Sequence, residues 1–151
     1  MDSLLVVFQL KRESYGIDIS RVQEIRVISA VTAMPNAPDY VEGAINLRGR
    51  VIPVIDMHSR FGQARTDRTK DTRIIVVNLS EGDWVGLIVD SVCEVLRLQT
   101  DTVEPPPPLV VTAAGDFVSG VAKVGEDRLV TLLDLDRLLP TTAAVVASPA
   151  F

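Results

Sequence analysis

The 151-residue sequence predicts an all-β fold made of two packed five-stranded barrels, with only short helices. Two observations carry this prediction. The chain repeats itself once, so one folding unit is present in two copies. Its apolar runs are short and rich in β-branched residues, which is typical of strands and too short for buried helices. Each copy holds about five such runs, which is enough for a small barrel.

The repeat begins at residues 4–17, LLVVFQLKRESYGI, which align without a gap on residues 74–87, IIVVNLSEGDWVGL. After an insertion in the second copy, residues 41–57 match residues 118–135. The matched pairs include Gly16 and Gly86, Glu24 and Glu94, Ile25 and Val95, Gly43 and Gly120, and Asp56 and Asp134. We expect residues shared by both copies to serve the fold, and residues that differ to be candidates for function.

Turn residues separate the predicted strands of each copy. In the first copy we predict strands at 4–10, 15–19, 23–28, 43–48 and 51–56. In the second copy we predict them at 74–79, 84–89, 93–98, 118–124 and 129–134. Residues 1–139 then form one domain, with subdomains at about 14–72 and 73–139 and a tail at 140–151. Whether the barrels exchange the strand at 4–10 stays open.

Helix signals are sparse. Asp56 and Asp134 each end an apolar strand, and either side chain could cap a short helix that follows it. The charged residues 63–72 read as a bridge between the copies. Pro105–Pro108 reads as a polyproline II spacer within the longer loop of the second copy.

Composition excludes several classes of protein. The net charge of −5 argues against a nucleic-acid binder, because phosphate contacts need a basic face. Neither a membrane-spanning stretch nor an export signal is visible, so we expect a cytoplasmic protein without membrane insertion. The single cysteine, Cys93, cannot form an internal disulfide, and its place in an alternating strand predicts a small core residue.

Signals for catalysis are weak. His58 is the only histidine, which excludes a histidine-rich metal site, and no glycine-rich phosphate loop is present. Asp56 and Asp134 could form an acid–base pair, but they occupy the same position in two copies, and capping explains both. We therefore predict no enzyme activity, no cofactor and no bound metal.

The differences between the copies point to an interaction surface. Asn46-Leu47-Arg48-Gly49 in the first copy becomes Lys123-Val124-Gly125-Glu126 in the second. The Arg48 guanidinium precedes a tight turn, where it could brace the loops or meet a carboxylate on a partner. Glu24 is shared with Glu94, which favours a role in the fold, whereas Arg26 becomes Leu96, which favours a surface role.

Four segments resemble one known family. They are YGIDISRVQEI (15–25), VEGAINLRGRVIPVIDM (41–57), VGLIVDSVCEVL (85–96) and GVAKVGEDRLVTLLDLDRLL (120–139), and the resemblance runs from residue 4 to about 139. The chain resembles the CheW family of chemotaxis coupling proteins. The resemblance implies two packed SH3-like barrels and a non-enzymatic adaptor that joins chemoreceptor cytoplasmic tips to the regulatory domain of the histidine kinase CheA. It also implies recruitment to membrane-associated receptor arrays.

The resemblance also implies sites. Positions associated with receptor docking or coupling are Val22, Glu24, Arg26, Gly43 and Arg48. Positions where one barrel would meet the kinase are Val27, Ile28 and Val31. Two alternatives stay open: a coupling protein of a non-flagellar chemosensory pathway, controlling pili or another output, and a small-molecule-binding β-barrel.

Overall fold

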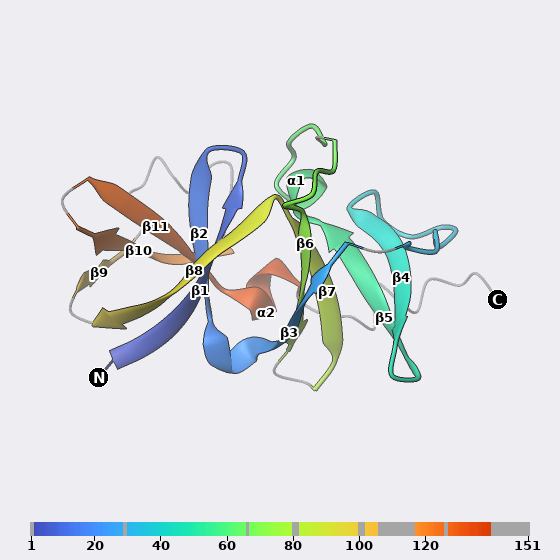
Figure 1. Cartoon of the computed structure of the whole chain (residues 1–151), viewed down its shortest axis with the longest axis horizontal. Helices are drawn as coiled ribbons and strands as arrows, with labels where there is room; N and C mark the ends of the chain where they lie inside the picture. Colours follow the sequence, from blue (N-terminus) through green and yellow to red (C-terminus); the bar gives the residue numbers. More distant parts are fainter. Residues whose placement is uncertain are drawn as a thin grey trace.

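The computed structural model of the chain describes residues 2–28, 30–65, 67–79, 82–99, 102–105, 117–125 and 127–139. It consists of two β-sheets with short helices, which confirms the predicted all-β class (Figure 1). The tail at 140–151 and Pro106–Pro108 of the proline run lie outside the described residues.

The first barrel has five strands in the order β3-β6-β7-β5-β4. Its strands are β3 (Val22–Val27), β4 (Val41–Leu47), β5 (Arg50–Asp56), β6 (Arg73–Asn78) and β7 (Trp84–Val89). A bridge between Thr32, which follows β3, and Ala44 of β4 brings the two edges together. All five coincide with predicted strands to within one or two residues.

The second barrel has six strands in the order β8-β1-β2-β11-β10-β9. Its strands are β1 (Asp2–Leu10), β2 (Glu13–Asp18), β8 (Ser91–Gln99), β9 (Val103–Glu104), β10 (Val118–Val124) and β11 (Arg128–Leu133). The short β9, absent from the predicted strands, follows β8 and pairs with β10. It therefore has the role that Thr32 has in the first barrel.

Each barrel takes its first hairpin from the other copy. The β1–β2 hairpin of the first copy lies in the second barrel, where Gly16 pairs with Leu132 in parallel. The β6–β7 hairpin of the second copy lies in the first barrel, where Gly86 pairs with Val54 in the same way. The exchange thus involves whole hairpins in both directions, and both sheets cross the predicted boundary at residues 72 and 73.

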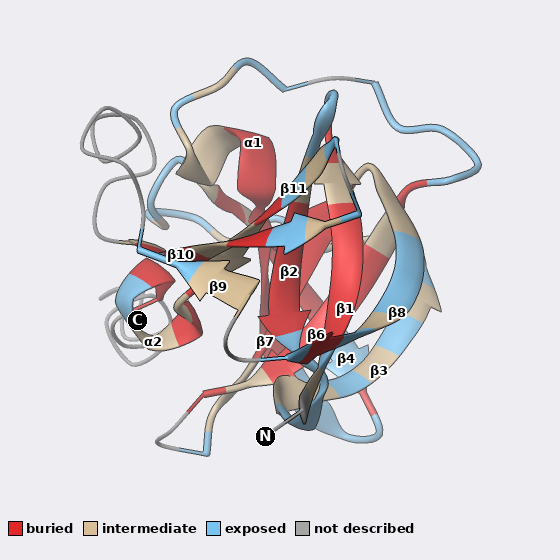
Figure 2. Cartoon of the chain, turned by 90° about the vertical axis from the view of Figure 1, so that its left-hand side faces the viewer, coloured by how far each residue is buried: buried red, intermediate tan, exposed pale blue. Residues whose placement is uncertain are grey.

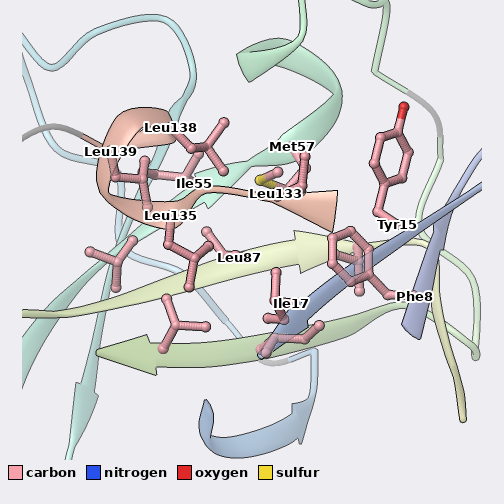
Figure 3. Close-up of a cluster of buried hydrophobic side chains, with 14 of the residues drawn as sticks. Phe8, Tyr15, Ile17, Ile55, Met57, Leu87, Leu133, Leu135, Leu138 and Leu139 are labelled. Carbon is pink, nitrogen blue, oxygen red and sulfur yellow. The ribbon is translucent and has the colours of Figure 1, made fainter. Parts of the chain in front are cut away.

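Burial on both faces explains the continuous apolar runs. In β1, Val6 and Phe8 face the core shared by the two barrels, while Leu5 and Val7 face the interior of the second barrel. The shared core draws side chains from both copies (Figure 3): Phe8, Ile17, Ile55, Met57, Leu87, Leu133, Leu135 and Leu138. Full burial of each such side chain stabilises the fold by about 1.5–3 kcal/mol, so this core holds the barrels together. Figure 2 shows buried residues concentrated on β1, β2, β6 and β7.

The exchanged hairpins differ in length by one residue. Val7 pairs with Gly16, and Val76 pairs with Gly86, so Val7 is equivalent to Val76. The ungapped alignment of residues 4–17 with 74–87 is therefore wrong by one position in its first strand. The reason is that the β6–β7 turn holds one residue more than the β1–β2 turn.

The third strand of each copy carries a β-bulge at the same place. Gln23 is the extra residue where Val22 pairs with Val77 and Glu24 with Val76. Cys93 is the extra residue in β8. Cys93 is exposed, so its predicted place in the core is wrong. A bulge interrupts the alternation of faces from which that prediction was made.

The three helices among the described residues are single turns. They are the 3-10 helix η1 (Ile19–Arg21), α1 (Met57–Arg60) and α2 (Leu135–Leu138). Asp56 caps α1, accepting a hydrogen bond from Ser59 N at 3.0 Å. Asp134 caps α2, accepting from the backbone N–H groups of Asp136 and Arg137. Both predicted caps are confirmed.

Candidate docking surface on the first barrel

Strand β3 sorts the predicted site residues onto two faces. Val22, Glu24 and Arg26 are partly buried and alternate with the exposed Gln23, Ile25 and Val27. Residues at every second position share one face of a strand. The bulge at Gln23 breaks this alternation, because Val22 pairs with Val77 and Glu24 pairs with Val76, and these two residues face opposite sides of β6. Glu24 and Arg26 therefore share one face of β3, and Val22 lies on the other face with Val27 of the kinase-docking set.

Glu24 is the centre of a charged cluster. Its Oε1 lies 3.0 Å from Arg48 Nη2, and its Oε2 lies 4.0 Å from Arg26 Nη1. Oε1 is shielded from solvent but outside hydrogen-bond geometry, so the attraction to Arg48 is that of an ion pair. Arg48 is 71% exposed and Glu24 is 24% exposed. Such a pair stabilises a fold by about 0–1 kcal/mol, and it leaves the guanidinium open to a partner.

Arg48 lies at the tip of the β4–β5 hairpin. The turn has two residues, Arg48 and Gly49, with φ of 52° and 83°. Positive φ at both positions is the pattern of a type I′ turn, where Asn and Gly are the usual residues. Asn46 Oδ1 accepts a hydrogen bond from Gly49 N at 3.0 Å, which supports the turn. The turn thus tolerates an unfavourable residue at the position that presents a cation.

Gly43 lies inside the fold rather than on the surface. A Cβ at this position would be 2.1 Å from the backbone oxygen of Thr32. The missing side chain lets the closing segment pair with β4. Gly43 can therefore influence a partner only through the shape of the barrel, and Val22, which packs against the shared core, is similarly recessed.

The predicted kinase-docking residues differ in exposure. Val27 is 66% exposed. Ile28 and Val31 are partly buried and pack against the core of the first barrel. Of the three, only Val27 presents most of its side chain to a partner.

Two exposed apolar residues were missed by the sequence analysis as site candidates. Ile25 is 42% exposed on the face of Val27, and Val51 at the start of β5 is 72% exposed. Val51 borders an apolar groove of about 320 Å³ that is also lined by Thr32, Met34, Ala44, Ile45 and Asn46. The repeat held a signal for both, because Ile25 matches Val95 and Val51 matches Leu129, and all four are exposed apolar residues.

The second barrel repeats this arrangement with other side chains. Glu94, the counterpart of Glu24, pairs with Arg128 at 2.5 Å. Arg128 is the counterpart of Arg50, which instead lies 4.1 Å from the ring centroid of Trp84 in a cation–π contact. The carboxylate is thus common to both barrels, and the arginine that neutralises it comes from a different position.

Chemistry beyond docking has little support in the described residues. Asp56 and Asp134 are engaged in capping, and His58 is 3% exposed with its Nε2 2.8 Å from Asp90 Oδ1. Within the described ranges, His, Cys, Asp and Glu side chains form no group of three or more that could hold a metal ion. The helices among these residues are too short and too weakly apolar to cross a membrane.

Comparison with known proteins matches this geometry. Residues 4–143 match the family model of the CheW-like domain. The chemotaxis protein CheW of Klebsiella aerogenes is 40% identical over 134 residues, covering 89% of this chain and 80% of that protein. CheW of Thermotoga maritima is 30% identical over 132 residues, covering 87% and 84%.

A solved structure agrees in fold. The crystal structure of the scaffolding protein TtCheW from Thermoanaerobacter tengcongensis superposes with a TM-score of 0.83 at 43% identity, covering 91% of this chain and 88% of that one. Family model, sequence relatives and structure therefore agree over nearly the whole described chain, and the chain belongs to the CheW-like family.

Proposed function

We propose that this chain is a non-enzymatic coupling adaptor of bacterial chemotaxis that joins chemoreceptor cytoplasmic tips to the regulatory domain of the histidine kinase CheA. Membership of the CheW-like family is the observation that carries the proposal. In this role the protein acts in the cytoplasm and is recruited to membrane-associated receptor arrays. The proposal needs no cofactor, metal or nucleic acid.

The receptor contact is assigned to the charged cluster of the first barrel. Arg48 offers a largely exposed guanidinium, and Glu24 and Arg26 hold the charges around it. A receptor carboxylate could share Arg48 with Glu24, since a guanidinium can bind two carboxylates through different N–H groups. Gly43 supports this surface from within the barrel, and Val22 supports it from the shared core.

The kinase contact is assigned to the apolar end of the same barrel. Val27 is its most exposed member, and Ile28 and Val31 support it from the barrel core. A regulatory domain with the same double-barrel fold could pack against it barrel to barrel. Because Val27 has the charged counterpart Arg97 in the second copy, the two barrels offer different contacts, which suits an open ring or array rather than a closed dimer.

The test is a reconstituted array of purified kinase, receptor vesicles and adaptor. We expect the adaptor to make kinase activity respond to the receptor. Val27→Glu should weaken kinase binding at least about tenfold, or about 1.4 kcal/mol, while receptor binding persists. Leu129→Glu is the matched control, because Leu129 is 59% exposed on the second barrel. Equal losses for the two variants, or none for Val27→Glu, would place the kinase contact elsewhere.

A non-flagellar pathway is the alternative within the same class. Reconstitution with receptors and kinases of each pathway in the source cell would separate the two, since only cognate partners should restore receptor control. The small-molecule alternative gains little from the described cavities. One cavity of about 420 Å³ at the second barrel has a single charged residue among those that line it, Asp18, and this carboxylate already caps η1.

A further inference from the structure

The chain passes between the barrels at two equivalent places. After β2 it crosses from the second barrel to the first through η1, which contains Arg21. After β7 it crosses from the first barrel to the second through the turn at Asp90. Ser20 is the counterpart of Asp90, and Ser91 is the counterpart of Arg21. We call these two places the crossovers.

The short helix of each copy contacts the crossover of the other copy. In α1, His58 Nε2 lies 2.8 Å from Asp90 Oδ1, and Asp90 Oδ2 also accepts a hydrogen bond from Lys11 N at 2.6 Å. In α2, Asp136 Oδ1 lies 2.9 Å from Arg21 Nη2. Because Asp56 matches Asp134, His58 and Asp136 are equivalent residues, so these are two versions of one contact.

The two contacts have opposite polarity. In the first, the helix supplies the imidazole and the crossover supplies the carboxylate. In the second, the helix supplies the carboxylate and the crossover supplies the guanidinium, whose Nε also donates to Asn78 O at 2.9 Å. The described structure thus contains two contacts of reversed polarity, made by helix residues at equivalent positions and by crossover residues that lie one position apart in the repeat.

This pattern distinguishes between ways of pairing the copies. Each copy already places its hairpin in the barrel of the other, so two chains could exchange hairpins by the same geometry. If two second copies paired, Asp136 would face the crossover that holds Asp90, which brings two carboxylates together. If two first copies paired, His58 would face the crossover that holds Arg21 and would lose its carboxylate partner.

We propose that these oppositely polarised contacts select the pairing of the first copy with the second copy within one chain, against exchange between like copies of two chains. Pairing of unlike copies satisfies both contacts, and pairing of like copies satisfies neither. Specificity of this kind rests on the unfavourable contacts of the alternatives as well as on the favourable contacts of the native pairing. The proposal is independent of the partners assigned above.

The test is refolding of the full chain from urea at increasing chain concentration, followed by size-exclusion chromatography with light scattering. Asp136→Arg places two guanidinium groups together within the chain, at residues 136 and 21. If two second copies paired, the new arginine would instead meet the carboxylate of Asp90. Arg21→Asp places two carboxylates together within the chain, at residues 21 and 136. If two first copies paired, the new carboxylate would instead meet His58. This variant also leaves the sequence of α2 unaltered. We expect each variant to raise the dimer fraction by about fivefold over the wild type, as dimers that dissociate only on unfolding.

The double variant Arg21→Asp/Asp136→Arg restores the contact within the chain but gives both helices a basic residue and both crossovers a carboxylate, so pairing of like copies is satisfied as well. It should therefore regain stability relative to the single variants in urea unfolding, while its dimer fraction stays raised by about fivefold over the wild type. Asp127→Arg is the matched control, since it makes the same charge change at an exposed turn of the second copy and should leave the protein monomeric. Monomeric single variants would overturn the proposal. A double variant that stays as monomeric as the wild type would also overturn it, because it lacks the difference in polarity between the copies.

Discussion

The first barrel closes where Thr32 pairs with Ala44, and the second closes where β9 pairs with β10. In both, a glycine lies under the closing segment: Gly43 in the first barrel and Gly120 in the second. A bulge stands at the same place in each third strand, at Gln23 and at Cys93. What the barrels share is therefore the geometry of closure, which explains why these positions match between the copies.

The barrels differ in the side chains around a common carboxylate. Glu24 is paired with Arg48 at a strained hairpin tip, whereas Glu94 is paired with Arg128 at the start of a strand. Val27 on the outer face of β3 is replaced by Arg97 in β8. Under the proposed receptor contact, Glu24 would belong to the shared fold and its ion-pair partner Arg48 to function, which would accommodate both interpretations of Glu24 that the sequence allowed.

The largest expected effect tests the shared closure. Gly43→Ala places a Cβ 2.1 Å from a backbone oxygen, and backbone cannot move aside as a side chain can. At Gly120 the nearest atom is Val103 Cγ1, at 2.8 Å. We expect Gly43→Ala to lower the free energy of unfolding by about 3 kcal/mol or more, and Gly120→Ala by about 1–2 kcal/mol, as measured by urea denaturation. The reverse order would show that the two closures are not equivalent.

The sequence predicted ten of the strands because its apolar runs and turn residues are local signals. It missed the register of the exchanged hairpins. LLVVF (4–8) and IIVV (74–77) fit equally well with a shift of one residue, since both faces of β1 and β6 are buried and each of these positions is apolar. A shift of one residue moves every side chain to the other face of the strand. The sequence reveals such a shift only where one face is polar and the other apolar.

The exposure of the candidate site residues could be predicted from the sequence only in part, for a similar reason. Residue identity marked Arg48 as a difference between the copies. The structure places its side chain beside that of Glu24, which is distant in the sequence. Exposure, however, depends on which face a strand presents, and the bulge at Gln23 and the return to Thr32 set that face. The sequence does not show this bulge or this return, so the set implied by the family resemblance placed Ile28 and Val31 with Val27, and Val51 was passed over.

The helix caps provide the next largest effect. Asp56 is 6% exposed, whereas the Asp134 side chain is 34% exposed, so water can replace the second cap more easily than the first. We expect Asp56→Ala to cost about 2 kcal/mol and Asp134→Ala about 0.5–1 kcal/mol in thermal or urea unfolding. Asn at either position should retain most of the stability, because its side-chain oxygen can still cap. Equal losses of stability for Asp56→Ala and Asp134→Ala would mean that the difference in burial between the two caps does not affect their strength.

Tyr15 distinguishes the copies at high pH. Burial raises the pKa of its phenol, and the hydrogen bond to Glu13 Oε2 at 2.8 Å raises it further, while the counterpart Val85 has no ionisable group. A pKa raised on folding means that the contribution to stability is present below the unfolded pKa, about 10, and is lost as pH rises above it. We expect the wild type to lose up to about 1.4 kcal/mol per pH unit more than Tyr15→Phe in urea unfolding above that pH. Parallel pH profiles for the two proteins would contradict this.

Arg48 should have the smallest effect on stability and a large effect on coupling. Its left-handed backbone costs about 1–2 kcal/mol, which glycine avoids, whereas glycine loses more backbone entropy and the exposed ion pair contributes about 0–1 kcal/mol. These terms nearly cancel, so Arg48→Gly should change the free energy of unfolding by less than about 1 kcal/mol.

In the reconstituted array Arg48→Gly should abolish receptor-dependent kinase activation, and Arg48→Ala should do the same in a folded protein. Arg128→Ala removes the equivalent partner of Glu94 on the second barrel and should leave activation unchanged. If Arg48→Gly unfolds more easily by several kcal/mol, Arg48 is a brace of the hairpin; if it couples fully, the first barrel meets its receptor through other residues.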